Sequence, residues 1–233
     1  MPRVVCCAAT RGAARATTPS HNKSSMQLID IHTHTLKEDA HKRITDSGTE
    51  ALPLCPCSVG VHPWRIIGDG HEQLQKVSEA AFRPTVVAIG ECGLDTLKSS
   101  APIETQIKIL LRHIEISEAA RKPLILHIVK SHHLLLKIAK ETPHTQAWIV
   151  HGFRGGAAQA RQLTAAGLYL SFGARFNAAA VEEAPADKIF IESDESPLPL
   201  EDIYAAVAQA KGLATQDIIR QIILNTNNCN IRL

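Results

Sequence analysis

Two histidines, His32 and His34, follow a short apolar run in the stretch IDIHTHTL at residues 29–36. Side chains two residues apart on a β-strand point to the same side of that strand. Two neutral imidazoles held side by side can bind one metal ion, so this spacing indicates a metal site. The alternative is a turn that contains histidine by chance, because the chain has 12 histidines.

Other residues able to bind a metal also follow apolar runs. They are His62, Glu91, His127 and His151, and, after the last run, Glu192 and Asp194. Any one of them could be a loop residue or, for an acid, a helix N-cap. Their repeated position predicts that the runs are strands whose carboxyl ends meet at one mouth, as in a parallel barrel.

The predicted ligand set contains four imidazoles and two carboxylates: His32, His34, Glu91, His127, His151 and Asp194. Such a set suits one or two divalent ions, and we expect two. Imidazole ligands favour Zn²⁺ or Mn²⁺, whereas Mg²⁺ prefers oxygen but could still support activity. The histidines outside these runs are expected to be solvated or structural.

The apolar runs are continuous and alternate with stretches of helical periodicity. Continuous apolar runs are typical of parallel strands buried on both faces, and seven clear strand–helix units predict an α/β fold, a TIM-type (β/α) barrel. The residues 42–46 could supply an eighth, uncertain strand, and the short span from 36 to 55 predicts a truncated first crossover. An open doubly wound sheet is the alternative, although no Gly-x-Gly-x-x-Gly turn follows the first strand. Strands are expected at 28–32, 57–63, 85–91, 123–128, 146–152, 168–173 and 188–194, and helices at 71–82, 103–122, 132–141, 156–166, 203–211 and 215–225.

The composition is that of one globular domain. The chain has 233 residues, 45% of them hydrophobic, and no apolar stretch of the roughly 18 residues that a membrane span needs. Its six cysteines form no regular pattern, so we expect reduced thiols, a cytoplasmic location and no obligate protein partner. The pair Cys55-Pro-Cys57 could be half of a zinc site, but no second pair accompanies it and ordinary loop residues are favoured.

The N-terminal segment 1–25 differs in composition from the rest. Residues 1–29 carry four basic side chains and no acid, which leaves 21 basic against 23 acidic residues in the remainder. The segment has the composition of a transit peptide, or it is an upstream extension of a start at Met26. We expect it to be disordered and residues 26–233 to form the barrel, whose slight acidity excludes a basic surface that coats nucleic acid.

Seven short motifs occur in order: DIHTH, SVGVHPW, AIGECGLD, LILHI, IVHGFRGG, LSFG and ESDESPL. As an ordered set over about residues 27–230 they resemble the TatD-like metal-dependent hydrolases and deoxyribonucleases, a branch of the amidohydrolase-type barrels. The resemblance implies a two-metal site with hydrolytic, often phosphodiester-cleaving, chemistry. DNA ends or short oligonucleotides are then the expected substrate, and no membrane contact is expected.

The resemblance also implies a role for each matched residue. His32 and His34 match the first metal pair, Glu91 the carboxylate that bridges two ions, and His127 and His151 the ligands of the second ion. Asp194 matches the aspartate that completes the first site and moves a proton. His62 matches a histidine that contacts substrate phosphate, and Arg154 takes the place of the family's usual serine, where it could also bind phosphate.

One departure from the family pattern affects the substrate more than the metal. Val129 and Lys130 stand where the family often has an arginine after the fifth-strand histidine. Two alternatives to a nuclease therefore remain: a hydrolase of small-molecule esters, lactones or amides, and a metal-binding protein without activity. The first is disfavoured because Glu91, and not a lysine, follows the corresponding strand.

Overall fold

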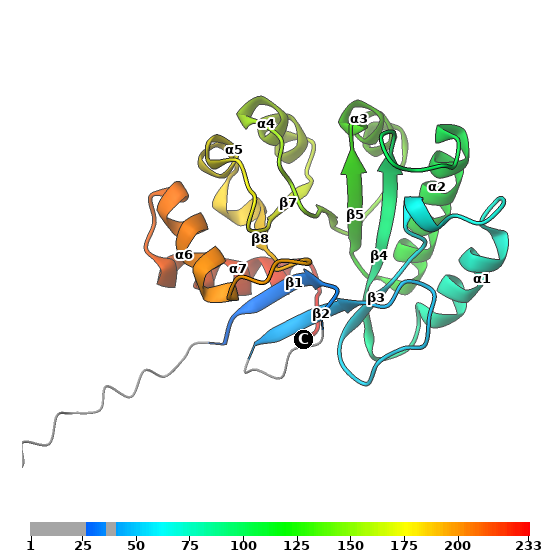
Figure 1. Ribbon diagram of the computed structural model, residues 1–233, viewed down its shortest axis with the longest axis horizontal. Helices are drawn as coiled ribbons and strands as arrows, with labels where there is room; N and C mark the ends of the chain where they lie inside the picture. Colours follow the sequence, from blue (N-terminus) through cyan, green and yellow to red (C-terminus); the bar gives the residue numbers. More distant parts are fainter. Residues whose placement is uncertain (1–26, 36–40) are drawn as a thin grey trace, which may run out of the picture.

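The computed structural model describes residues 27–35 and 41–233 and forms one sheet of eight parallel strands, paired in sequence order (Figure 1). The predicted barrel is confirmed, and the stretch with the weakest strand pattern, Lys42–Asp46, is its second strand. The expectations for residues 1–25 lie outside the described residues. The strands are β1 Ile29–Thr33, β2 Lys42–Asp46, β3 Cys57–Val59, β4 Val86–Asp95, β5 Leu124–Val129, β6 Trp148–Val150, β7 Tyr169–Phe172 and β8 Ile189–Ile191.

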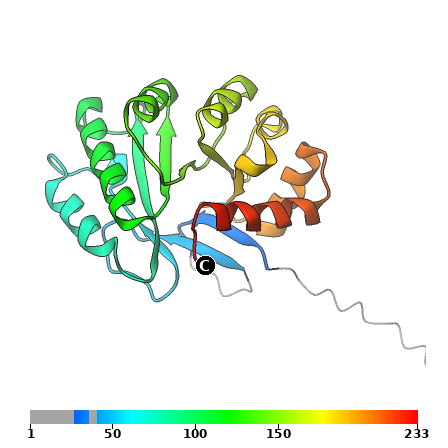
Figure 2. The ribbon, with the colours of Figure 1, turned by 180° about the vertical axis from the view of Figure 1, so that it is seen from behind.

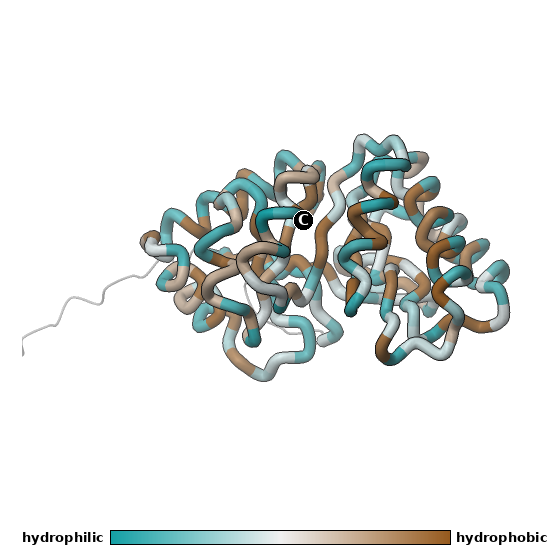
Figure 3. Tube along the Cα trace, turned by 90° about the horizontal axis from the view of Figure 1, so that it is seen from above, coloured by the Kyte–Doolittle hydropathy of each residue, from teal (hydrophilic) through white to brown (hydrophobic). Residues whose placement is uncertain are grey.

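Helices cover most of the outside of the barrel. Seen from above, they lie in two arcs on either side of the strands, with apolar segments mixed among polar ones along each helix (Figure 3). The helices are α1 His71–Ala80, α2 Ile103–Ala120, α3 His132–Glu141, α4 Ala157–Ala165, α5 Ala178–Glu183, α6 Leu200–Lys211 and α7 Thr215–Asn228, with short 3₁₀ turns η1 Pro63–Arg65 and η2 Ala186–Lys188. None of the described helices is both long and apolar enough to cross a membrane.

Two predictions about helices have different outcomes. Gly167, at a φ of 90°, follows the end of α4 as expected for a helix stop. The helix α5 was not predicted, because its six residues are too few to display helical periodicity. Its start is set by Asn177, whose side chain accepts a hydrogen bond from the backbone N–H of Ala179 (3.0 Å).

The side of the barrel formed by β1 and β2 is less covered than the rest. Residues 47–56 join β2 to β3 without a helix, and the described residues between β1 and β2 form none either. The predicted truncation is therefore found in the described part of the first crossover, and it extends to the second. From behind, α7 lies across this side of the molecule and contacts β1 and β8 (Figure 2).

The barrel is closed between β1 and β8 at the level of the predicted ligands. Thr33 and Asp194 form an isolated parallel bridge, and the backbone N–H of Asp194 donates to the carbonyl of His32 (3.0 Å). Below this bridge the buried carboxylate of Asp30 accepts hydrogen bonds from the backbone N–H (2.8 Å) and hydroxyl (2.6 Å) of Ser193. We call these contacts the β1–β8 seam.

The strand β4 contains an irregularity that re-aims one side chain. Its pairing with β5 shifts between Ile89 and Cys92, and Gly90 adopts a φ of 145°. A Cβ atom at Gly90 would overlap the carbonyl oxygen of Ile125, so only glycine fits there. Such an irregularity bends a strand and redirects its side chains, which places Glu91 inside the barrel. The prediction that this strand stops at Glu91 is wrong, because β4 continues to Asp95.

His113 is a structural histidine, as predicted for histidines outside the apolar runs. It is fully buried on α2, where Nε2 accepts a hydrogen bond from the backbone N–H of Val61 (3.0 Å) and Nδ1–H donates to the carbonyl of Ile109 (2.8 Å). Burial lowers its pKa to about 4. The neutral ring therefore ties α2 to the segment that precedes His62.

The free energy of unfolding should fall as this ring is forced to take a proton. The pKa of His113 is lower in the folded chain than its ordinary value, so its contribution is complete above pH about 6.5 and is lost as the pH falls toward 4. The loss is about 3 kcal/mol for a shift of this size. Urea unfolding between pH 4 and 7 should therefore show a shallower pH dependence for His113→Gln than for the unchanged protein. Parallel curves for the two proteins would contradict this assignment.

Candidate metal centre

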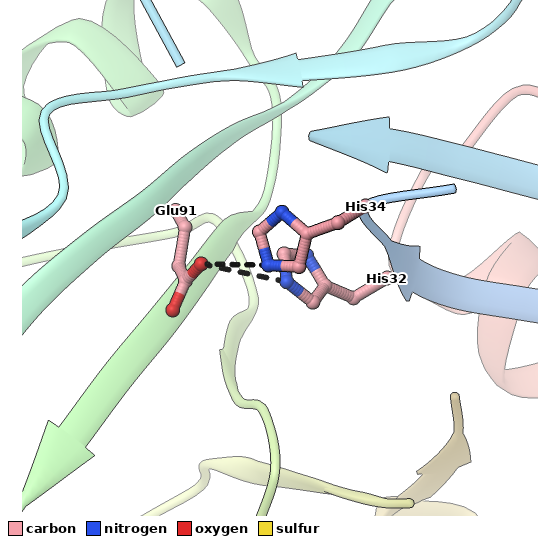
Figure 4. Close-up of side chains that lie close together, drawn as sticks. All are labelled: His32, His34 and Glu91. Carbon is pink, nitrogen blue, oxygen red and sulfur yellow. Dashed lines mark ion pairs between the residues drawn. The ribbon is translucent and has the colours of Figure 1, made fainter. Parts of the chain in front are cut away.

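Glu91 lies at the centre of a cluster of imidazoles inside the mouth of the barrel. Its Oε2 faces the pair at the end of β1, at 3.5 Å from His32 Nε2 and 3.6 Å from His34 Nε2 (Figure 4). These three side chains offer ligand atoms that all lie within 4.8 Å of one another. The predicted proximity of the pair to Glu91 is therefore present in the fold.

The other carboxylate oxygen of Glu91 faces a second group of histidines. Its Oε1 lies 2.6 Å from His151 Nε2, 2.7 Å from His127 Nδ1 and 3.1 Å from His62 Nε2. Together, His62, Glu91 and His127 form another set of ligand atoms within 4.8 Å. Glu91 thus turns one oxygen toward each group, which is the arrangement that a carboxylate between two ions requires.

Asp194 approaches the cluster from the β1–β8 seam. Its Oδ1 lies 3.5 Å from His34 Nε2, and it forms a third set of ligand atoms with His32 and His151. Its backbone has a φ of 52°, in the left-handed region that few non-glycine residues adopt. The seam holds the backbone in this conformation, so the carboxylate is directed into the mouth. All six predicted ligands therefore meet at one end of the barrel.

His32 provides an independent test of whether a metal fits. Its side chain is fully buried, and neither ring nitrogen has a hydrogen-bond partner among the described residues. Buried polar atoms are nearly always paired, and an ion would supply the missing partner. The mixture of imidazole and carboxylate donors suits Zn²⁺ or Mn²⁺ better than Mg²⁺. The residues present therefore fit a bound divalent metal.

Three carboxylates without a predicted role as ligands lie on the side of the imidazoles that faces away from Glu91. Asp46 Oδ2 lies 3.6 Å from His34 Nδ1, Asp95 Oδ2 lies 3.0 Å from His127 Nε2, and Glu192 Oε1 lies 3.4 Å from His151 Nδ1. In each pair the other ring nitrogen faces Glu91. A carboxylate in this position orients a metal-binding histidine and fixes which nitrogen is free to bind.

The sequence carried a partial signal for these supporting carboxylates. Glu192 follows an apolar run, and Asp95 lies within the motif AIGECGLD, but neither position distinguishes a ligand from its support. Asp46 ends the uncertain strand β2. Only the three-dimensional arrangement shows which carboxylates face one another and which face the back of a histidine.

Glu91 and His151 shift the pKa of each other in opposite directions. Burial alone would raise the pKa of Glu91, but the charge on His151 and hydrogen bonds from the surrounding histidines hold it well below its usual value. Burial would likewise lower the pKa of His151, but the charges of Glu91 and Glu192 outweigh it and raise that pKa well above normal. Because a histidine binds metal only when neutral, an ion that occupies this position releases a proton.

A cavity of about 940 Å³ opens above the cluster. Its walls include the predicted substrate residues His62 and Arg154, so both lie where a substrate would enter. Basic side chains are prominent around it: Arg65, Lys98, Lys130, Arg154 and Arg175. His132 and His133 also line the cavity, although the sequence assigned them no role; their position at the start of α3, just after β5, was the available signal.

The cysteine pair does not contribute to a metal site in the described part of the chain. Cys57 is buried, Cys55 is partly buried and both are free thiols. No group of metal-binding side chains among the described residues contains either of them. The interpretation of Cys55 and Cys57 as ordinary residues is the one that fits this arrangement.

The fold and the cluster together define a (β/α) barrel whose mouth carries side chains suited to binding a metal, at the end where barrel enzymes have their active sites. The sequence profile of the TatD-related DNase family matches residues 14–229, so the chain belongs to this family. The resemblance predicted from the seven motifs is confirmed.

Individual relatives agree with this assignment. An uncharacterized metal-dependent hydrolase, YabD of Bacillus subtilis, is 31% identical over 145 residues, which are 59% of this chain and 57% of that protein. A protein of Erwinia amylovora named 3'-5' ssDNA/RNA exonuclease TatD is 28% identical over 150 residues, 60% of this chain and 58% of its own. The aligned region thus spans less than two thirds of these two relatives.

The fold is shared with a solved structure over a larger part of the chain. The crystal structure of YjjV, a TatD homologue from Escherichia coli, superposes with a TM-score of 0.73 at 21% identity. The superposition covers 87% of this chain and 97% of the bacterial protein. The TIM-barrel architecture is therefore established independently of the motifs.

Proposed function

We propose that this protein is a metal-dependent phosphodiesterase that acts on DNA ends or short oligonucleotides and uses two divalent ions. The observation that carries the proposal is the division of the histidines between the two oxygens of Glu91, beneath a cavity with basic walls. Lewis acids and cationic side chains both assist cleavage of a phosphodiester, because they compensate its negative charge. Ions held by the predicted ligands would supply the first, and the basic cavity walls would supply the second.

Each group of residues has a defined part in this proposal. His32 and His34 with Glu91 and Asp194 would hold one ion, and His127 and His151 with Glu91 would hold the other. Ions held there supply Lewis acidity and lower the pKa of a water molecule. Asp194, at the edge of the cluster, accepts or relays the proton of the attacking water.

The cavity walls bind and orient the substrate. Arg154 provides two parallel N–H donors for a phosphate, whereas Lys130 and Lys98 act as point charges. His62 Nε2 lies 3.1 Å from Glu91 Oε1, a position from which it can bind either phosphate or metal. The resemblance to the family favours phosphate. The name of the Erwinia relative supports single-stranded nucleic acid as the substrate class.

The experiment that tests the proposal compares substrates on one purified protein. Single-stranded DNA labelled at its 3′ or 5′ end should be shortened in the presence of Mn²⁺, Mg²⁺ or Zn²⁺ and remain intact with a chelator. Elemental analysis of the same sample should find the bound ion. Cleavage confined to small esters, lactones or amides would favour the second candidate, and bound metal without any turnover would contradict an enzymatic role.

A further inference from the structure

Trp64 is an aromatic side chain at the cavity wall that belongs neither to the predicted metal ligands nor to the basic side chains. Its side chain is 46% exposed, although most large apolar residues of the barrel are buried. It lines the cavity and its ring centroid lies 4.8 Å from that of His62 and 5.3 Å from that of His127. A group bound next to the predicted metal ligands would therefore contact the indole.

The indole is held rigidly despite its exposure. Its Nε1–H donates to Asp95 Oδ2 (2.6 Å), and its backbone N–H donates to His62 Nδ1 (3.1 Å) within the turn that Pro63 begins. The same Asp95 oxygen lies 3.0 Å from His127 Nε2. One carboxylate oxygen thus fixes both a predicted metal ligand and the aromatic ring beside it.

The long, flexible side chain of a lysine lies over the indole ring. The ammonium of Lys98, an exposed residue, lies 4.6 Å from the ring centroid. A cation over an exposed ring strengthens an interaction by about 2- to 5-fold, whereas stacking of one base on an aromatic side chain strengthens binding by about 5- to 150-fold. A nucleobase can therefore displace Lys98, whose ammonium is then free to pair with a phosphate.

We propose that Trp64 is a fixed stacking platform for the base of a nucleotide next to the scissile phosphate. This proposal rests on the nuclease function proposed above. It adds a residue that binds the base and the requirement that this base is unpaired. The platform binds a base that is unpaired, because a base inside a duplex is already stacked on its neighbours. Since every base has a π-face, the platform distinguishes a base from no base and has little preference among the four.

The first test measures binding without metal or turnover. The chain has two tryptophans, and Trp148 is buried with 2% exposure, so quenching by a bound base reports on Trp64. In the presence of a chelator, an oligothymidylate should quench the tryptophan fluorescence. An oligomer of the same length made of abasic nucleotides should quench it several-fold less. Equal quenching by both oligomers, or none by either, would overturn the platform.

The second test measures the cleavage of three single-stranded DNA substrates. Each contains a single abasic nucleotide, placed at a different one of the last three positions. At one position the abasic nucleotide should lower kcat/KM by about 5- to 150-fold in the unchanged protein. The ratio of kcat/KM for the intact strand to kcat/KM for the abasic strand should be smaller in Trp64→Phe and about one in Trp64→Ala. The control is Phe82→Ala, which removes another exposed aromatic ring (63%) outside the cavity and should keep the full ratio.

The outcomes separate the platform from the nuclease function. Cleavage with the same ratio in Trp64→Ala as in the unchanged protein would overturn the platform and leave the nuclease function intact. Base-dependent quenching by an oligomer that is not cleaved with any metal would overturn the nuclease function and support the platform. Melting curves of Trp64→Ala and Trp64→Phe verify that a lost ratio does not come from unfolding.

Discussion

Glu91→Gln is expected to lose both tightly bound metal and turnover. The substitution keeps the size of the side chain but removes the negative charge that faces two groups of histidines at once. Replacing a residue that only supports a ligand typically costs 10- to 100-fold, so a residue that contacts both groups should cost more than about 100-fold in kcat/KM. Metal content by elemental analysis and oligonucleotide cleavage measure the two effects separately.

A matched control distinguishes this effect from a general loss of negative charge. Glu104, exposed at the start of α2, can be replaced by glutamine without any change near the mouth. Glu104→Gln should keep the metal content and kcat/KM of the unchanged protein. Full metal occupancy in Glu91→Gln would remove Glu91 from the centre of the site.

Asp194→Asn is expected to lose turnover while the fold is kept. The β1–β8 seam uses the backbone of Asp194 and not its carboxylate, so closure of the barrel does not depend on the charge. Loss of a group that moves a proton in the transition state costs about 100- to 10,000-fold in kcat. The measurements are kcat with saturating metal and the thermal midpoint without metal.

The control for this change is an exposed aspartate outside the cavity. Asp202→Asn alters a carboxylate at the start of α6 and should leave kcat within about 3-fold, as expected of a surface change. If Asp194→Asn retains the kcat of the unchanged protein with added Mg²⁺, Mn²⁺ or Zn²⁺, Asp194 has no part in proton transfer.

The parts of this fold that the sequence predicts well are those with strong periodicity. The helix at 132–141 was predicted at the bounds that α3 has, and the continuous apolar runs marked the strands because parallel strands are buried on both faces. The uncertain strand Lys42–Asp46 and the missed helix Ala178–Glu183 are both short. Short elements are held by tertiary contacts, which local sequence patterns do not record.

The candidate site was predictable as a set of ligands but not as an arrangement. The position of His127 or Asp194 after an apolar run was enough to place it at the mouth. Which oxygen of Glu91 faces which histidine depends on the shift in β4, and the sequence shows only a Gly90-Glu91 pair there. Trp64 lies in the motif SVGVHPW, but the motif predicts no role for it, because its exposure and its hydrogen bond to Asp95 arise only in the folded chain.

The β1–β8 seam links closure of the barrel to the completeness of the predicted ligand set. Asp194 lies in the segment that bridges the last strand to the first, whereas His32 and His34 lie on the first strand. A chain that ends before β8 therefore lacks both the closing contacts and one of the six predicted ligands, so a C-terminal truncation of this kind removes the site together with the closure.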